Sequence, residues 1–458
     1  MTTVVQSQTK TITKLPDGPN AHPLVQIIQG IFKPFEYLEA AQQRYGDIFT
    51  MRNLGFPPTV VLSHPEAIQE VFNADPSLLD TVTSNKILAP LFGENSLIQI
   101  DGVRHQYRRK LLMPPFHGQR MRAYGQTISE VTQEVMGKWQ VDQPFCARTS
   151  TQEISLRVIL RAVFGLDKGE RYEQLRQLLS SMTDTFNSPL ASSPLFIKFL
   201  RKDLGAWSPW GHFIRQKRQI NALLTAEIHD RKSQPELLGE DILSLMMTAQ
   251  DENGQSMTEE ELRDELMTML FAGHETTASA LAWAFYWIHR LPEVREKLLQ
   301  ELDSLGEEDD YTAVAKLPYL NAVCSETLRL YPVVLFTFAR ILKSPLEIMG
   351  YQFEAGTALA PCIYLTHHRE DLYPEPKRFK PERFLERQFS PSEYLPFGGG
   401  NRRCLGYAFA QYEMKLVLAT ILSQVQLKLA DSRTLKPVRR GVTFTPASGV
   451  QVVMTGDR

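Results

Sequence analysis

The longest helical pattern in the sequence, Met257–His289, constrains the fold most strongly. Thr258 and Glu261 have the spacing of a capping box at its start, and Pro292 follows its end. A helix of about 33 residues is roughly 50 Å long, which is enough to cross a whole domain. The pattern therefore predicts a central helix around which a mainly α-helical chain packs.

The middle of this helix is too polar for a membrane span. Its most apolar window, residues 266–288, carries His274, Glu275, Thr276 and Thr277 at its centre. A carboxylate at the middle of a bilayer costs about 2.5–3.5 kcal/mol on insertion scales. We therefore expect a buried helix in a globular protein.

Composition and charge agree with a globular cytoplasmic protein. Of 458 residues, 43% are hydrophobic, which is enough for a sizeable core. The 50 basic and 52 acidic residues give a net charge of −2, so no overall basic field predicts nucleic acid or an anionic membrane as partner. Residues 1–20 lack the apolar core of a signal peptide or anchor, and we expect them to be flexible.

Periodicity predicts helices along most of the chain, with strand-like alternation only near its ends, at about 48–65, 345–362 and 449–456. The remaining predicted helices are His64–Phe72, Arg104–Leu112, Tyr124–Lys138, Gln152–Phe164, Arg171–Phe186, Trp210–Ser233, Glu293–Leu305, Tyr319–Tyr331 and Cys404–Val425. No internal repeat or low-complexity linker divides the chain. We expect one domain over residues 1–458, mainly α with a small β region.

The four cysteines lie far apart, without spacing for a zinc site or a disulfide framework. Cys146, Cys324 and Cys362 are expected to be small buried hydrophobic residues. Cys404 differs, because FGGGNRRCLG places it at the predicted start of a helix, beside Arg402 and Arg403. This setting favours a thiolate, which acts as a nucleophile or a metal ligand. No hydrolase or cysteine-protease signature accompanies Cys404, so a metal ligand is the better interpretation.

Three other motifs allow two interpretations each when taken alone. AGHETT, residues 272–277, is either a kink in a core helix or a functional site, because Gly273 costs about 1 kcal/mol relative to alanine there. Glu326 and Arg329 are spaced to pair on a helix, and an ordinary surface pair would contribute only about 0.2–0.5 kcal/mol. Arg383 lies in the proline-constrained segment RFKPERF.

Together these motifs resemble the cytochrome P450 haem-thiolate monooxygenases, in that family's order along the chain. FGGGNRRCLG matches the cysteine-loop pattern FxxGxRxCxG, AGHETT resembles the oxygen-activating segment, and the ExxR pair and PERF supply Glu326, Arg329 and Arg383. The chain looks closest to the cyanobacterial fatty-acid-hydroxylating branch. The resemblance implies the cytochrome P450 fold, with the 257–289 helix crossing the haem.

The resemblance also implies haem b, iron protoporphyrin IX, with Cys404 as the ligand of its iron. The other residues that it places at the haem are Phe397, Gly398, Arg402, Gly406, His105, Arg109, Arg340 and Ala272. Arg402, His105, Arg109 and Arg340 match positions that bind the haem propionates, although His105 and Arg109 could instead form a solvated helix face. Thr276 and Glu275 are expected to deliver protons during oxygen activation. Glu326, Arg329 and Arg383 are expected to form a buried structural network.

Electrons are expected from a ferredoxin-type protein and its NAD(P)H-dependent reductase, because no flavin or nicotinamide signature follows Cys404 and no fused reductase is recognised. Basic residues that could dock an acidic carrier are Arg104, Arg108, Lys110, Arg403 and Lys415. We expect a monomer without a transmembrane anchor.

By resemblance, the substrate pocket includes Leu88, Phe271, Val334, Leu335, Phe338 and Phe444. These apolar side chains predict hydroxylation of a lipophilic substrate, a fatty acid or a terpenoid or steroid-like molecule. The turn at residues 54–58 lacks the arginine with which a bacterial fatty-acid hydroxylase binds its substrate carboxylate. Two other functions stay open: a haem-thiolate isomerase or lyase acting on peroxides, and a haem-binding protein without catalysis.

Overall fold

The computed structural model describes residues 14–52, 57–116, 118, 120–205, 208–250, 254–305 and 310–458. The chain divides into two compact units. The first contains the chain up to Lys86 together with Leu335–Leu372 and Phe389–Arg403, and the second contains Ile87–Val334, Tyr373–Gln388 and Cys404–Arg458. The mainly α architecture with small sheets is confirmed.

The first unit combines short helices with a five-stranded sheet of order β1-β2-β8-β5-β3 and the hairpin β6-β7. Its strands are β1 Ile48–Met51, β2 Thr59–Leu62, β3 Leu79–Asp80, β5 Arg340–Leu342, β6 Leu346–Ile348, β7 Tyr351–Phe353 and β8 Ala358–Pro361. Its helices are α1 Pro23–Phe32, α2 Pro34–Tyr45, α3 Pro65–Asn73, α4 Val82–Asn85 and α17 Ile363–His367, with the 3-10 turn η6 at Gly400–Arg402.

The segment before α1 packs against the first strand. The Thr50 N–H donates to the Asp17 carbonyl at 3.2 Å, and a Cβ on Gly18 would lie 1.9 Å from the Thr50 oxygen. Only glycine allows this close approach. Part of the N-terminal segment expected to be flexible, from Asp17 onward, is therefore fixed to the sheet, while residues 1–13 lie outside the described chain.

The second unit contains most of the helices and two small sheets, β4-β12-β9 and β10-β11. Its helices are α5 Ala89–Phe92, α6 Gly102–Leu112, α7 Arg120–Met136, α8 Ala147–Phe164, α9 Glu170–Thr185, α10 Pro189–Phe196, α11 Pro209–Ser233, α12 Ile242–Thr248, α13 Glu259–Arg290, α14 Pro292–Asp303, α15 Tyr311–Lys316, α16 Pro318–Leu330, α18 Arg383–Glu386 and α19 Tyr407–Gln424. Its strands are β4 Pro144–Cys146, β9 Val425–Leu429, β10 Pro437–Arg440, β11 Thr443–Pro446 and β12 Gln451–Asp457.

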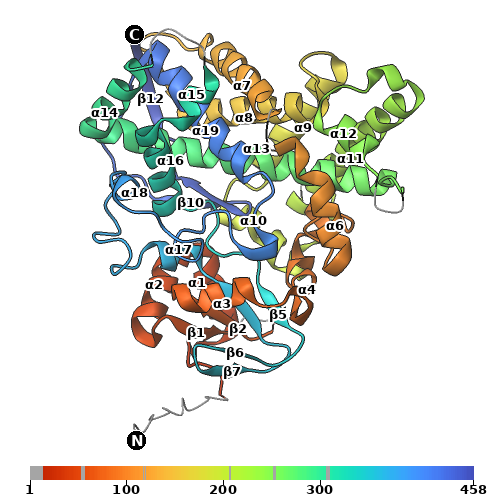
Figure 1. Ribbon diagram of the computed structural model, residues 1–458, viewed down its shortest axis with the longest axis vertical. Coiled ribbons are helices and arrows are strands. Elements are labelled where there is room, and N and C mark those ends of the chain that lie inside the picture. The colour runs from red at the N-terminus through yellow and green to blue at the C-terminus, as the bar shows by residue number, and fades with distance from the viewer. Residues whose placement is uncertain are drawn as a thin grey trace, which may run out of the picture. The chain divides into compact units, whose positions relative to one another are not determined.

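Helix α13 is the centre of this second unit, as Figure 1 shows, and it packs against α8, α11, α16, α19 and β11. Thr258 and Glu261 form the predicted capping box, and the helix ends at Arg290, before Leu291 and Pro292. Gly273 lies against α8, where a Cβ would be 3.0 Å from Cδ1 of Ile159. The glycine therefore allows close helix packing, and α13 runs through it without a break.

All ten predicted helices are confirmed, with shifted ends. The shift that matters for function is at α19, which begins at Tyr407 with Gly406 as its N-cap residue, so Cys404 precedes the helix. Periodicity missed the short strands β3, β4, β5, β9, β10 and β11, because runs of two to five residues carry little alternation. In the part of the chain that the structure describes, no helix combines the length and the apolar character needed to cross a membrane.

Candidate functional site

The glycines of the cysteine loop pack tightly against α3 in the first unit. Gly398 and Gly400 have φ values of +65° and +63°, which side chains rarely adopt. A Cβ on Gly399 would lie 2.2 Å from the Phe72 ring, and one on Gly400 would lie 3.0 Å from the Phe72 carbonyl. The three glycines therefore allow the loop to follow the surface of α3 closely, and Phe397 precedes them.

Arg340 and Arg402, both predicted to bind propionates, are buried together in the first unit. Arg340 donates to Thr337 Oγ1 at 3.3 Å, to the Phe338 carbonyl at 2.9 Å and to the Gly399 carbonyl at 3.0 Å. Burial and, to a smaller extent, the positive charge of Arg402 lower the pKa of Arg340 to about 10. Two guanidinium groups that repel each other in a buried place favour an anion, and the carboxylates of haem b fit this requirement.

Cys404 is the exposed residue among the four cysteines, none of which forms a disulfide in the described chain. Cys324 and Cys362 are buried, and burial raises the pKa of each thiol to about 12. Cys404 instead lies three residues before α19, where the helix N-terminus favours negative charge on sulfur. Accessibility and helix position make Cys404 the cysteine that fits an iron ligand.

His105 and Arg109 lie on α6 in the second unit. His105 is buried, which rejects a solvated helix face for this residue, and Arg109 is half-buried. The neighbouring Arg108 was expected at the surface, and this expectation was wrong. It is buried and pairs with Glu261 and Glu265, because residues four apart on α13 face α6.

Two more residues of the expected docking patch form interactions within the protein. Arg104 pairs with Glu261 at 2.8 Å, and Lys415 is partly buried and donates to the Ala315 carbonyl at 2.8 Å. Arg104, Lys110 and Arg403 are exposed, but the Arg104 side chain is already paired with Glu261, so Lys110 and Arg403 are the exposed members of the group outside these pairings. Sequence spacing could not show these pairings, because each joins residues on different helices.

Thr276 lies where α13 is accessible along an otherwise buried helix. Ala272 is exposed and Thr276 is half-buried, whereas Phe271, Glu275 and Thr277 are buried. The Thr276 hydroxyl donates to the Ala272 carbonyl at 2.6 Å, one turn earlier. The accessible face therefore presents a hydroxyl that is held on the helix.

Glu275 is buried against α8, and its partners were not predicted. It forms an ion pair with Arg148 and accepts a hydrogen bond from Gln152 at 2.8 Å. Asp184 on α9 is exposed, and its pKa is raised by partial burial and by the negative charge of Glu275, against the opposing effect of Arg148. Nothing in the spacing of Arg148 or Gln152 indicated these contacts, which join positions more than 120 residues apart.

Glu326, Arg329 and Arg383 come together in a buried cluster of the second unit. Arg329 donates twice to Glu326, from Nε to Oε2 at 2.6 Å and from Nη2 to Oε1 at 2.9 Å. Arg383 Nε donates to the same carboxylate at 3.2 Å, and so does the Lys380 N–H at 2.8 Å. Glu326 and Arg329 are both fully buried, so the alternative of a surface pair is excluded.

The residues expected in the substrate pocket belong to both units. In the second unit, Phe271 makes an edge contact with Phe92 of α5, with ring centroids 5.9 Å apart, and Phe444 is buried on β11. Leu88 and Val334 are half-buried there. In the first unit, Leu335 is buried and Phe338 is half-buried. Of the turn without the expected arginine, residues 54–56 lie outside the described chain.

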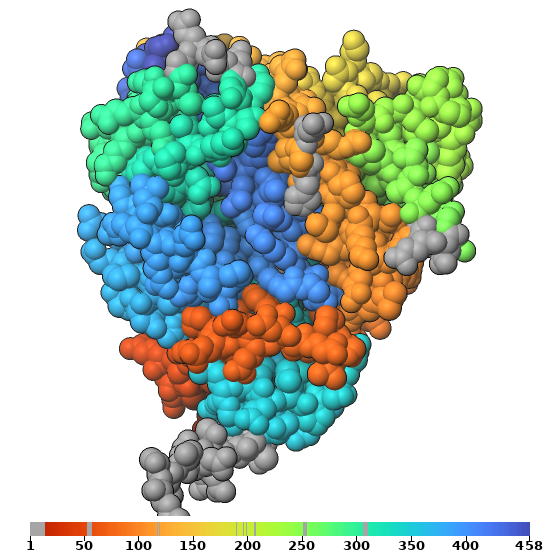
Figure 2. All heavy atoms as spheres, in the orientation of Figure 1, coloured from red at the N-terminus to blue at the C-terminus, as the bar shows by residue number. Residues whose placement is uncertain are grey.

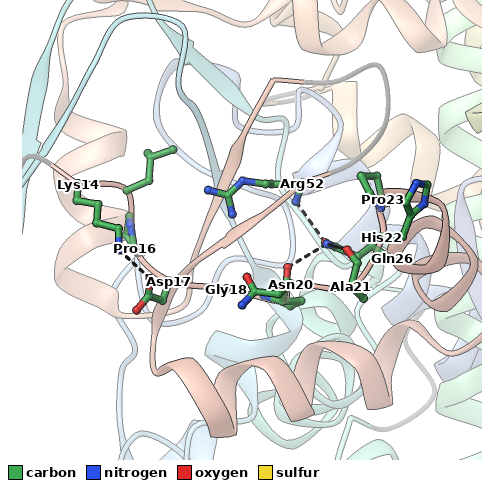
Figure 3. A pocket seen from close by; sticks show the side chains of 12 residues that line it. Lys14, Pro16, Asp17, Gly18, Asn20, Ala21, His22, Pro23, Gln26 and Arg52 are labelled. Atoms are coloured by element: carbon green, nitrogen blue, oxygen red, sulfur yellow. Dashed lines mark hydrogen bonds and ion pairs between the residues drawn. The ribbon is translucent and has the colours of Figure 1, made fainter.

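A separate hollow of about 770 Å³ lies in the first unit, lined by residues 14–23 with Gln26 and Arg52 (Figure 3). The Gln26 amide donates to the Pro19 carbonyl at 3.0 Å and accepts from the Arg52 N–H at 3.3 Å. None of the predicted site residues lines it, so we do not assign the hollow to the functional site.

Comparison with known proteins agrees with this chemistry. The family model described as "Cytochrome P450" matches residues 16–454. Cytochrome P450 135B1 of Mycobacterium tuberculosis is 37% identical over 97% of this chain and 92% of its own length, and cytochrome P450 138 of the same organism is 33% identical over 97% of both chains.

Solved structures show the same fold. Retinoic-acid-bound cyanobacterial CYP120A1 matches with a TM-score of 0.85 and 26% identity, over 97% of this chain and 99% of that chain. This neighbour agrees with the cyanobacterial branch suggested by the sequence. Because the family model spans nearly the whole sequence and the relatives cover it at up to 37% identity, the chain belongs to the cytochrome P450 family of haem b monooxygenases.

Proposed function

We propose that this monooxygenase hydroxylates C–H bonds of a lipophilic substrate, with Cys404 as the ligand of the haem iron. The observation that carries the proposal is the exposed Cys404 thiol directly before α19, in a protein whose Cys324 and Cys362 thiols are buried. Haem iron held by a thiolate supplies the activation of molecular oxygen. Arg340 and Arg402 would hold the propionates, with His105 and Arg109 from α6.

Protons would reach the reaction through the residues around Glu275. Asp184 is exposed to solvent, and its raised pKa suits a group that takes up and releases protons. Arg148 and Gln152 hold the Glu275 carboxylate in place, and Thr276 is its neighbour on α13. The Thr276 hydroxyl, which donates to the Ala272 carbonyl, presents its oxygen on the accessible side of the helix.

The substrate would be an isoprenoid or fatty acid. Phe271, Phe92 and Phe444 give the second unit an apolar wall beside the accessible part of α13, and apolar walls select lipophilic molecules. The cyanobacterial neighbour is described as binding retinoic acid, a lipophilic isoprenoid carboxylic acid. This supports the same class of substrate here.

The electron donor would be a ferredoxin-type protein with its NAD(P)H-dependent reductase. Figure 2 shows α19, in blue, reaching the surface of the second unit, and α19 packs against α7. Lys110 on α6 and Arg122 on α7 are exposed and could contact an acidic carrier. Reconstitution with a surrogate ferredoxin system, NADPH and labelled oxygen gas tests this function, and one labelled oxygen atom in the product is the expected result.

Cys404→Ser tests the ligand. The ferrous carbon monoxide complex should lose its red-shifted thiolate-type Soret band, because serine is a poor ligand for haem iron. Cys146→Ser is the matched control. It should keep the band, because the Cys146 thiol is not the proposed iron ligand and instead donates to the Gly449 carbonyl. A thiolate band that survives Cys404→Ser would reject the assignment.

A further inference from the structure

Glu413 on α19 is a carboxylic acid in the protein core without hydrogen-bond partners. Its side chain is fully buried, and neither carboxyl oxygen has a partner among the described residues. It is the one acidic residue in the described chain with this property. Buried polar groups are otherwise nearly always paired, so an exception indicates a role.

The Ser155 hydroxyl on α8 is a polar group close to Glu413. It lowers the pKa of Glu413, yet it lies outside hydrogen-bond geometry and is itself buried without a partner. Burial has the larger effect and raises the pKa of Glu413 to about 8. At neutral pH the carboxyl is therefore protonated, and it lies near the Ser155 hydroxyl.

Charged groups on the surrounding helices do not stabilise an ionised Glu413. Helix α19 packs against α7, α13, α14, α15, α16 and β9. The titratable groups on these elements and on α19 include Tyr124, Glu130, Glu134, His274, Glu275, Glu301, Lys316, Cys324, Glu326, Arg329, Lys415 and Lys428. None of these groups shifts the pKa of Glu413. The shift has two causes, burial and the Ser155 hydroxyl. An ionised carboxylate would stay unpaired in an apolar core, which is strongly unfavourable.

Ionisation would affect Cys404 through α19. Glu413 is the seventh residue of this helix, and Cys404 lies three residues before its start. A helix moves as a rigid body over such a short length, so a shift that admits water to Glu413 also displaces the helix N-terminus.

We propose that the protonated Glu413 side chain is a positioning residue for Cys404. It holds α19 in the core beside Ser155 of α8, and loss of its proton loosens α19 and weakens binding of the thiolate to haem iron. This inference rests on the proposed role of Cys404 as ligand, but the behaviour of α19 can be measured without haem.

The main experiment follows the ferrous carbon monoxide spectrum of the holoenzyme from about pH 6 to about pH 10. The thiolate-type band should disappear as one proton is lost, with a midpoint near pH 8. In Glu413→Gln, which is always neutral, the midpoint should move up by at least about one pH unit. Ser155→Ala should also raise it, because the Ser155 hydroxyl lowers the pKa of Glu413.

Glu265→Gln is the matched control. Glu265 is also buried, and burial raises its pKa to about 7, but it pairs with Arg108 on α6. This variant should leave the midpoint unchanged. If the midpoint moved equally in Glu265→Gln and Glu413→Gln, or stayed unchanged in Glu413→Gln, the proposal would be overturned.

A second measurement uses the haem-free protein. Because the folded pKa of Glu413 lies above its ordinary value, protonation stabilises the folded state at low pH, and this contribution is lost as the pH rises towards 8. The melting temperature of Glu413→Gln minus that of wild type should therefore increase from about pH 5 to about pH 8 and then stay constant. A difference independent of pH would overturn the anchoring role.

The spectra of the holoenzyme and the melting of the haem-free protein separate the role of Cys404 as iron ligand from the role of Glu413 as anchor of α19. If the wild-type holoenzyme bound haem without a thiolate band at any pH, the role of Cys404 would fail, and the haem-free series would still decide whether Glu413 anchors α19. If Glu413→Gln did not fold, Glu413→Met would replace it as an apolar side chain of similar size. A midpoint near pH 8 that persisted in Glu413→Met would contradict the proposal.

Discussion

Two buried arginine–glutamate clusters of the second unit use the same chemistry in different ways. In the cluster of α16, Glu326 accepts from Arg329, Arg383 and the Lys380 N–H, and Arg383 also donates to the Pro374 carbonyl at 3.1 Å. In the cluster of α13, Glu275 has one arginine, Arg148, and one amide, Gln152. The first carboxylate is completely enclosed, whereas the second is electrostatically coupled to the exposed Asp184.

The difference suggests that one cluster has a structural role and the other a role in the reaction. A buried network in which each polar group is satisfied is rigid, and removing one member leaves a charge that no water can reach. A buried acid that interacts electrostatically with an exposed acid is suited to the proton supply proposed above. The α16 cluster would therefore stabilise the fold, and the α13 cluster would support the reaction.

Glu326→Ala should have the largest effect and would test this division most directly. Arg329 and Arg383 would lose their shared carboxylate in the core, and unfolding free energy should fall by about 3–5 kcal/mol, with loss of haem. Denaturant unfolding and haem content are the measurements. Arg378→Ala is the control, because its side chain is 68% exposed and only pairs with Glu375, so the change should stay below about 0.5 kcal/mol. Equal effects of the two variants would contradict the comparison.

Arg148→Ala should have an intermediate effect. Glu275 would keep Gln152 as a partner but lose its cation, so we expect a loss of about 2–3 kcal/mol in unfolding free energy. Product formation should also fall by about tenfold, because the acid next to Thr276 would no longer be held in place. Arg148→Lys should recover part of the unfolding free energy and part of the product formation. A variant that lost stability but kept full turnover would remove Arg148 from the proton route.

Thr276→Ala should have the smallest effect on stability, less than about 1 kcal/mol, since its hydroxyl bonds to the Ala272 carbonyl of the same helix. Substrate binding and NADPH oxidation should continue, but product should decrease and hydrogen peroxide should increase. The ratio of product to NADPH consumed is the measurement, and Thr277→Ala, which removes the hydroxyl bonded to the Gly273 carbonyl, is the control. Unchanged coupling in Thr276→Ala would exclude its hydroxyl from the proton route.

The sequence by itself determined the features that depend on neighbouring residues. The capping box of Thr258 and Glu261 and the pairing of Glu326 with Arg329 three residues later were readable because local backbone geometry creates each contact. The mainly α fold followed from helical periodicity for the same reason. The prediction of a single domain remains a prediction.

Only the tertiary structure decided which distant residues share an environment. It paired Arg148 with Glu275, buried Arg108 against Glu261 instead of leaving it for a partner protein, and left Glu413 without a partner inside the core. Burial and long-range pairing set the protonation of these groups, because the cost of a charge depends on the solvent and the charges around it. Those surroundings are assembled from helices far apart in the chain, so no local pattern records them.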